Sequence, residues 1–333
     1  MAMSLAACGG KTETPAETPD ASSDAQTPST DPITISLCNA YSDLDQLNTE
    51  LKDAADRISE RTNGVVTVNV YPNNTFGDPN SWVDATNADA PIISVASFPA
   101  WDDKYPEADA LQAGFVWESP EEIIRFYDTD LCKKIIADLD EQNIHSLNAP
   151  IAAGMRHVIG RAAYSTPEAI KGLKLRTVNG KAWLECFQAM GASPMGMASS
   201  EQLSALSAGT IDALDQSINL IYSTKSYELV KDVTLLAQQP LWDAMFCSTK
   251  WWNSLPAEYQ EIIEDELHQA GIRYNQYSVE NEGKMREEME AAGVEFHEAD
   301  RQAFLDMGCS DLVLKYGIGQ ELLDTLAEIR AAE

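Results

Sequence analysis

The stretch ITISLCNAYSDLDQLNTELKDAADRISERTNGVVTVNV, residues 33–70, contains two hydrophobic periods in succession. At its start, apolar and polar residues alternate, which is typical of a half-buried strand with Ile33, Ile35 and Leu37 on one face. Apolar residues then recur every three or four positions, which predicts a helix whose buried stripe is formed by Leu44, Leu47, Leu51, Ala54, Ala55 and Ile58. Asn63-Gly64 provides the left-handed stop that ends such a helix.

Alternation resumes directly after this stop. Val66, Val68 and Val70 predict a second strand, which ends at the turn Tyr71-Pro72-Asn73-Asn74. The apolar run over residues 92–96 is long enough for a third, buried strand. The order strand, helix, strand, helix, strand predicts an α/β protein in which a parallel sheet carries helices on both faces.

Three later segments carry helix signals. Ser119-Pro120-Glu121-Glu122 combines an N-cap, a proline at the first helical position and a capping-box glutamate, which predicts a helix to about Leu139. Thr166-Pro167-Glu168 opens a shorter helix. Residues 256–292 form one very long helix or two in register. At 1.5 Å per residue, about 35 helical residues reach about 50 Å, so this helix is expected to brace two lobes.

A second α/β unit is expected over residues 149–249, with strands near Leu173 and Leu175 and from Met245 to Ser248. The length of 333 residues suits two such lobes. The first lobe then covers residues 33–148, with part of the C-terminal region returning to it. Residues 250–333 supply the bracing helix and the C-terminal helices.

Overall charge and composition exclude several classes of function. With 23 Lys plus Arg against 53 Asp plus Glu, the formal net charge is −30, which excludes nucleic-acid binding through a general basic surface. No apolar run is long enough to span a bilayer as a helix. The six cysteines contain no C-x-x-C pair, so no structural zinc site is expected, and we interpret most of them as buried small hydrophobes. If Cys8 has a separate role, at least one of the other five stays free, and the sequence assigns no pair.

The N-terminus suggests an extracytoplasmic address. Leu5-Ala6-Ala7-Cys8-Gly9 resembles the lipobox at which bacterial lipoproteins are cleaved and acylated, so Cys8 is the expected lipidated residue, although the basic region and most of the apolar region of a signal peptide are missing. Residues 11–32 contain no aromatic and no branched aliphatic residue. They consist of Thr, Pro, Ser, Ala, Asp, Glu, Gln and Lys, which predicts a disordered tether. The alternative is an unrelated start followed by a flexible tail.

One segment departs from the acidic character of the chain. Between Arg156 and Lys181, six basic residues stand against the single acid Glu168, a net charge of +5. Arginine suits a carboxylate because its guanidinium presents a rigid fork of donors and stays charged when desolvated. The segment is therefore a candidate site for an anionic ligand, and the alternative is a basic surface patch balanced by acidic neighbours.

Catalytic signatures are weak. The four histidines form no H-E-x-x-H pair, and the sequence contains no G-x-S-x-G elbow, no phosphate-binding P-loop and no dinucleotide-binding glycine motif. These absences lower the case for an enzyme, and the alternative is a catalytic carboxylate pair that the spacing does not single out. The sequence predicts neither a cofactor nor a bound metal.

Several ordered blocks carry a family resemblance. Gly154-Met155-Arg156, the run Ser165–Glu168, Ile170–Arg176 and Val178-Asn179 resemble the substrate-binding subunits of tripartite ATP-independent periplasmic (TRAP) transporters, the DctP-type family. The resemblance covers about residues 33–325, and its other blocks are Tyr71-Pro72-Asn73, Phe76-Gly77, Met190–Pro194, Ser200-Glu201, Leu203, Ala205-Leu206, Gly209, Ile211–Ala213 and Ser254–Pro256. It implies a two-lobe periplasmic binding protein fold with hinge strands and a long bracing helix.

The resemblance also implies a set of ligand-binding residues. Arg176 matches the arginine that forms a bidentate salt bridge with the ligand carboxylate, Arg156 matches an assisting arginine, and Asn179 matches a pocket asparagine. Two positions depart from the family: Gln216 replaces an asparagine and Ser199 replaces an aromatic residue. We expect first-lobe contacts with the ligand from Ser97, Phe98 and Trp101. For Trp242, in a loop before Met245, there are two interpretations: it stacks on the ligand, or it belongs to the core.

These residues imply an extracytoplasmic solute receptor for a small organic acid, which delivers its ligand to the membrane subunits of a sodium- or proton-coupled TRAP transporter. We expect a monomer that is not an enzyme and that contacts the membrane only through a lipid at Cys8. Two alternatives remain open: an extracellular enzyme acting on an acidic substrate, and a ligand-sensing module for a signalling protein. The sequence does not identify the organic acid.

Overall fold

β1 (Ile33–Cys38) is the centre of the first lobe in the computed structural model, which describes residues 31–332. It pairs in parallel with β2 (Val66–Tyr71) and with β3 (Ile92–Ala96). The connections are α1 (Gln46–Arg61) and α2 (Pro79–Asn87), so the predicted order of elements is confirmed. β9 (Pro240–Cys247) then adds to β3 in the antiparallel sense, which makes this sheet mixed.

The second lobe repeats the pattern around β5 (Lys174–Thr177). This strand pairs in parallel with β6 (Ser193–Gly196) and β7 (Ala213–Ser217). The helices of the lobe are α5 (Pro167–Ile170), α6 (Lys181–Ala189), α7 (Gln202–Ser207) and α8 (Ile218–Thr224). A parallel pair of β8 (Asp232–Leu235) and β10 (Glu295–Glu298) extends it through β4.

β4 (His145–Gly160) joins the two sheets. Its first part pairs with β9, whereas Arg156 to Gly160 pair with β7, and the register shifts between Ala152 and Met155. Gly154, within this shift, has φ of +91°, a conformation that glycine adopts without strain. The expected lobe boundary at residue 149 falls inside β4, and β9, from the range expected for the second lobe, pairs with the first-lobe strand β3.

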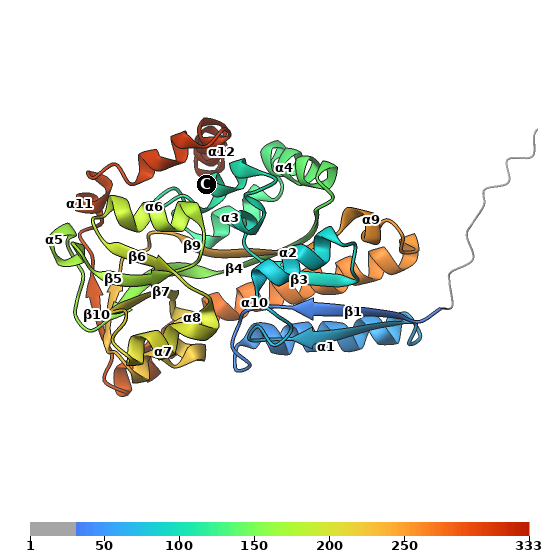
Figure 1. Ribbon diagram of the computed structural model, residues 1–333, viewed down its shortest axis with the longest axis horizontal. Coiled ribbons are helices and arrows are strands. Elements are labelled where there is room, and N and C mark those ends of the chain that lie inside the picture. The colour runs from blue at the N-terminus through green and yellow to red at the C-terminus, as the bar shows by residue number, and fades with distance from the viewer. Residues whose placement is uncertain (1–30, 333) are drawn as a thin grey trace, which may run out of the picture.

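The long helix α10 (Ala257–Ala291) is a single helix of 35 residues, one of the two forms that the sequence allowed. It packs against α1, β4 and α8, and therefore touches elements of both lobes (Figure 1). The C-terminal helices complete the fold: α12 (Gly319–Ala331) returns to α3 (Pro120–Phe126) and α4 (Asp130–Glu141). The remaining short helices are α9 (Thr249–Trp252), α11 (Arg301–Leu305) and 3₁₀ turns at Phe98–Trp101, Pro106–Gln112, Ser199–Glu201, Ser226–Glu228 and Ser310–Lys315.

Buried residues fill both faces of each sheet. Ile35 and Leu37 of β1 pack with α1 and α10 on one face of the first sheet, and an aromatic cluster around Phe98 and Trp117 covers the other. In the second lobe, Val158 and Ile159 alternate between two separate clusters, as adjacent strand residues must. Helices thus lie on both faces, as the sequence predicted.

Two helix boundaries differ from the sequence prediction. Leu44, expected in the first helical stripe, is 70% exposed, because the Asp45 side chain accepts from the Leu47 N–H and starts the helix at Gln46. The helix expected over residues 119–139 is two helices. Thr129 caps the second by accepting from the Cys132 N–H at 3.2 Å, and the chain turns between them.

The five cysteines of the described residues, Cys38, Cys132, Cys186, Cys247 and Cys309, are buried and free, which confirms their interpretation as small hydrophobes. Residues 31–332 contain no helix that is both long and apolar enough to cross a membrane. Cys8 and most of the expected tether lie outside the described residues, so the lipid anchor stays a prediction.

Candidate functional site

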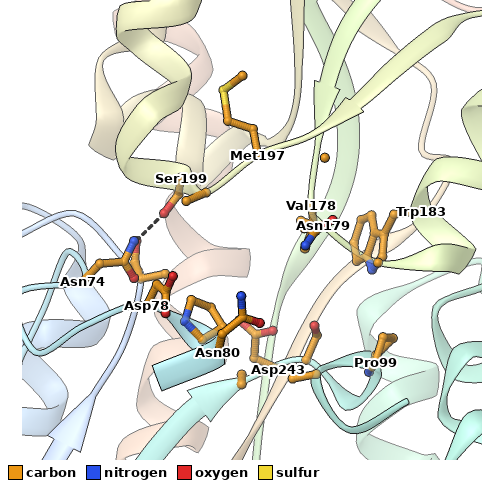
Figure 2. Close-up of a pocket in the computed structure, with 18 of the residues that line it drawn as sticks. Asn74, Asp78, Asn80, Pro99, Val178, Asn179, Trp183, Met197, Ser199 and Asp243 are labelled. Carbon is orange, nitrogen blue, oxygen red and sulfur yellow. Dashed lines mark hydrogen bonds between the residues drawn. The ribbon is translucent and has the colours of Figure 1, made fainter. Parts of the chain in front are cut away.

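A cavity of about 950 Å³ lies between the two lobes. Its walls come from loops and strand ends of the first lobe and from β5, α6 and the loop after β6 in the second (Figure 2). Figure 2 shows Asn74, Asp78, Asn80 and Asp243 on one side, and Val178, Asn179 and Trp183 on the other. A cavity of this size, at an interface between lobes, is a common setting for a small-molecule site.

Arg176 lines this cavity from β5 and is 5% exposed. Its Nε and Nη2 donate to the Met197 carbonyl oxygen, at 3.0 and 2.6 Å. Within the described part of the chain, no carboxylate forms a salt bridge with it. Burial, together with the like charge of Arg156, lowers the pKa of Arg176 to about 10, so the side chain stays charged at neutral pH.

Arg156 also lines the cavity, but it is committed to a buried acid. Its Nε lies 3.0 and 3.1 Å from the two carboxylate oxygens of Asp215. Its guanidinium also stands 4.7 Å from the ring centre of Trp183, in a cation–π contact. Thr177 and Gln238 donate to the same carboxylate at 2.8 and 2.7 Å, so Asp215 is fully occupied.

Three more of the predicted site residues line the cavity: Asn179, Ser97 and Ser199. Asn179 is exposed and lies close to Gly196, the last residue of β6. A Cβ added at Gly196 would lie 2.6 Å from the Asn179 Oδ1, so glycine allows this close approach. Ser199 reaches across to the first lobe and donates to the Ala40 carbonyl oxygen at 3.1 Å. Position 199 therefore bridges the lobes in this structure.

Gln216 lines the cavity and is fully buried within the second lobe. Its Nε2 donates to Gln202 Oε1 at 3.4 Å and to Thr224 Oγ1 at 3.3 Å. Its Oε1 accepts from Ser226 Oγ at 2.7 Å. The amide is satisfied by protein partners, which supports a role in shaping the wall.

The predicted aromatic residues belong to the core beside the cavity. Phe98 and Trp101 are buried and are absent from the described residues that form its wall. Trp242 lies within β9, where a loop had been expected, and it packs edge-on against Trp117 and Phe126. It is 1% exposed, although it borders the cavity. Of the two interpretations considered from the sequence, the core position therefore describes Trp242 better than a stacking position on the ligand.

The positive segment does not form one patch. Arg156, Arg176 and Lys181 line the cavity, whereas Lys171 and Lys174 are exposed on other surfaces. The two arginines face the cavity because residues 156 and 176 belong to strands on either side of β7. Counting charges along the sequence identified the segment that contains the cavity arginines, but it could not tell which of its basic residues line the cavity.

Sequence reasoning missed three cavity residues. Trp183 is buried, and its Nε1 has no hydrogen-bond partner among the described residues. Both amide atoms of Asn74 are likewise buried without a partner in residues 31–332. Asp243 accepts from the Tyr41 hydroxyl at 2.8 Å, and burial raises its pKa. The only signal for Asp243 was its place beside Trp242, as an acid inside a strand that is otherwise apolar.

A separate group of possible metal ligands lies at the surface. Atoms of Asp232, Glu295 and His297 lie within 4.8 Å of one another on β8 and β10. His297 Nε2 already contacts Asp232 Oδ1 at 2.9 Å, so two of the three satisfy each other. We assign no metal to this group.

Comparison with known proteins gives consistent results. The family model described as bacterial extracellular solute-binding protein, family 7, matches residues 39–311. The 2,3-diketo-L-gulonate-binding periplasmic protein YiaO of Escherichia coli K12 is 26% identical over 269 residues, which cover 80% of this chain and 81% of YiaO.

Two solved structures of TRAP periplasmic solute-binding proteins align over almost their whole length. The protein from Desulfovibrio salexigens, in complex with diglycerolphosphate, has a TM-score of 0.86 and 29% identity, covering 90% of this chain and 98% of its own. The protein from Fusobacterium nucleatum, with bound sn-glycerol-3-phosphate, has a TM-score of 0.86 and 26% identity, covering 90% and 99%. The two-lobe cavity and these matches together establish that the chain belongs to the DctP family of TRAP-transporter solute-binding proteins.

Proposed function

We propose that this protein is an extracytoplasmic receptor that binds a small organic acid through a salt bridge between Arg176 and the acid's carboxylate. The observation that carries the proposal is a buried, charged guanidinium beside a cavity of about 950 Å³, paired among the described residues only with the Met197 carbonyl oxygen. A buried charge without a counter-charge is unfavourable, and a carboxylate ligand would supply one.

Arg156 takes a supporting role in this proposal. Because Asp215 neutralises Arg156, this pair adds no second free cation beside Arg176. Its stacking on Trp183 fixes the guanidinium plane at the cavity wall. A ligand carboxylate would then find one guanidinium without a carboxylate partner, that of Arg176, beside the fixed polar side chains of the cavity wall.

The arrangement of the sheets supports hinge closure as the physical device. β4 crosses from one sheet to the other and β9 runs beside it, so we propose that the chain divides into two lobes that rotate at this crossing. Opening would break two hydrogen bonds between the lobes. Ser199 Oγ donates to the Ala40 carbonyl oxygen at 3.1 Å, and Ser42 Oγ donates to the Ser223 carbonyl oxygen at 3.2 Å. Closure removes water from the salt bridge and strengthens it.

The ligands named for the relatives support an anionic solute. The YiaO name gives a keto sugar acid, and the two solved structures hold glycerol phosphates. An arginine fork suits either a carboxylate or a phosphate, so a phosphate ester is the second candidate for the head group. Delivery to the membrane subunits of a TRAP transporter, and attachment through a lipid on Cys8, complete the proposal.

A thermal-shift panel tests the function. The purified protein is melted with single carboxylates and phosphate esters, and hits are titrated by calorimetry. Arg176→Ala should cost about 2–5 kcal/mol of binding free energy, because it removes one partner of a desolvated charge pair. Arg176→Lys should recover little, since an ammonium cannot reproduce the two-pronged contact.

Lys171→Ala is the matched control. It removes one positive charge from the same segment, but residue 171 is exposed and outside the cavity wall. Unchanged affinity in Arg176→Ala would refute the salt bridge. Recovery of a chemically altered ligand after incubation would favour the enzyme alternative, which mass spectrometry of the mixture detects.

A further inference from the structure

The two walls of the cavity differ in charge. Among the described residues, the basic ones that line it are Arg156, Arg176 and Lys181, on β4, β5 and α6 of the second-lobe side, where Glu185 and Glu201 also line it. The acids on the opposite wall are Asp78, Asp84, Asp102, Asp103 and Asp243. Among the described residues that line this first-lobe wall, none is a lysine or an arginine. Among the described residues, a lining cation that could pair with an anionic group is therefore found on the second-lobe side alone.

Asp243 is an acid of this wall that is held by the protein through one oxygen and has an open acceptor at the other. Its Oδ2 accepts from the Tyr41 hydroxyl at 2.8 Å, while Oδ1 has no hydrogen-bond partner among residues 31–332. Figure 2 shows the side chain beside Asn80, on the opposite side from Asn179 and Trp183. Because Asp243 lines the cavity, a ligand group that donates a hydrogen bond could complete this open oxygen.

Two neutral groups at the cavity also lack partners. The Oδ1 and Nδ2 atoms of Asn74 and the Nε1 of Trp183 are buried and have no partner within the described part of the chain. A hydroxyl group donates and accepts, so it can satisfy an amide oxygen, an amide nitrogen and a carboxylate oxygen. An ionised carboxylate only accepts, so it can satisfy neither Asp243 nor the Asn74 oxygen.

From this asymmetry we infer that the ligand carries one anionic head and a hydroxylated remainder, and that the wall around Asp243 rejects a second carboxylate at the far end. The inference rests on the proposed function, because the anionic head is the group held by Arg176. A terminal carboxylate would approach a wall that carries five acids and no lysine or arginine, whereas a terminal hydroxyl would donate to Asp243. Rejection by unpaired charge and recognition by hydrogen bonding thus act in the same direction.

Matched pairs of ligands test this selection at pH 7.5. Each pair differs only by oxidation of a terminal CH₂OH to a carboxylate: D-galactonate with galactarate, D-gluconate with D-glucarate, and sn-glycerol 3-phosphate with 3-phospho-L-glycerate. The first two pairs have a carboxylate head and the third a phosphate head, so they also distinguish the two head groups. We expect at least one alcohol-ended member to bind at least tenfold more tightly than its oxidised partner in calorimetry.

Asp243→Asn separates the charge of this residue from its shape. The amide oxygen can still accept from the Tyr41 hydroxyl, so the fold is retained, and a thermal melt checks this. We expect the preference for the alcohol-ended ligand to fall at least fivefold, because the repelling charge is gone. Asp53→Asn is the matched control: it removes one negative charge from the exposed outer surface of α1 and should leave the preference unchanged.

The outcomes separate the two proposals. If succinate, adipate or the oxidised member of a pair binds wild-type protein as tightly as the alcohol-ended ligands, the selection by Asp243 is overturned while the proposed function stands. An unchanged preference in Asp243→Asn also overturns it. If no carboxylate or phosphate ester in either panel binds, the proposed function fails, and the inference built on it fails too.

Discussion

Arg156 and Asp215 are diagonal neighbours on the antiparallel strands β4 and β7, with Arg156 Nε 3.0 Å from Asp215 Oδ1 and both side chains almost fully buried. Arg176 lies on β5, on the other side of β7, and influences the same region, since the charge of Arg156 lowers its pKa and that of Asp215 raises it. One acid thus stands between two arginines and is engaged by one of them. This relationship leaves Arg176 available to a ligand.

Removing the acid from this group should destabilise the protein strongly. In Asp215→Ala, Arg156 would remain buried without a counter-charge, and the donors of Thr177 and Gln238 would lose their acceptor. Breaking a buried pair in this way costs about 3–5 kcal/mol of unfolding free energy. Urea denaturation followed by circular dichroism measures the loss.

Asp212→Ala provides the comparison. Asp212 lies 3.9 Å from Arg161, and both side chains are more than 40% exposed. Exposed pairs contribute about 0–1 kcal/mol, so this variant should lose little. Equal losses in the two variants would contradict the structural role that we give to Asp215.

The buried thiols should be inert in the folded protein. Burial raises the pKa of Cys38 and of Cys132 to about 12, and that of Cys309 to about 11. The thiolate is the reactive form, so these residues should resist alkylation at pH 8 and react fully once urea unfolds the chain. Peptide mapping after timed treatment with N-ethylmaleimide gives the answer for each cysteine, and fast labelling of any of the three in the native state would be the contrary result.

The sequence predicted the elements better than it predicted the cavity wall. Period-two and period-three-to-four patterns placed β1, α1 and α10, because burial of one face governs those residues. The failures at Leu44 and at Thr129 were local, since either helix start depends on which polar side chain caps it.

Cavity residues depend on distant contacts that no local pattern records. Arg176 came from a family resemblance. Among the described residues it lacks a carboxylate partner, which depends on Asp215 being occupied by Arg156, 59 residues away. Trp242 and Asp243 are neighbours on one strand, yet one packs into the aromatic core and the other borders the cavity with an open oxygen. Only the pairing of β9 between β3 and β4 fixes which face each side chain takes.

Two glycines of α10 should respond oppositely to alanine. A Cβ at Gly283 would meet nothing within 4 Å, so Gly283→Ala should stabilise the protein by about 0.5–1 kcal/mol through helix propensity. A Cβ at Gly271 would lie 3.0 Å from the Pro150 carbonyl oxygen of β4. Because helix and strand pack there at close range, Gly271→Ala should lose that gain. Thermal melts of both variants decide it, and an equal rise in Tm would contradict the close approach.

His157 should make the protein less stable as pH falls. Its ring is buried in β4, and its Nδ1 accepts from the Ala237 N–H at 3.1 Å. Burial, with the positive charges of Arg286, Arg156 and Arg301, lowers its pKa from 6.5 to about 3. Between these two values the unfolded chain binds a proton that the folded protein does not, so unfolding free energy declines by up to about 1.4 kcal/mol per pH unit.

His157→Asn isolates this contribution from that of the many carboxylates. The Asn side-chain oxygen can accept from the Ala237 N–H in place of Nδ1, but it does not titrate. The variant is expected to start less stable at pH 7.5, because the smaller side chain leaves part of the buried space unfilled. Its deficit against wild type should then shrink as the pH is lowered from 6.5 towards 4.5, since only the wild type loses the histidine contribution. Urea unfolding of both proteins at half-unit pH steps measures the difference, and parallel curves across this range would show that the ring is protonated in the folded state as easily as in the unfolded one.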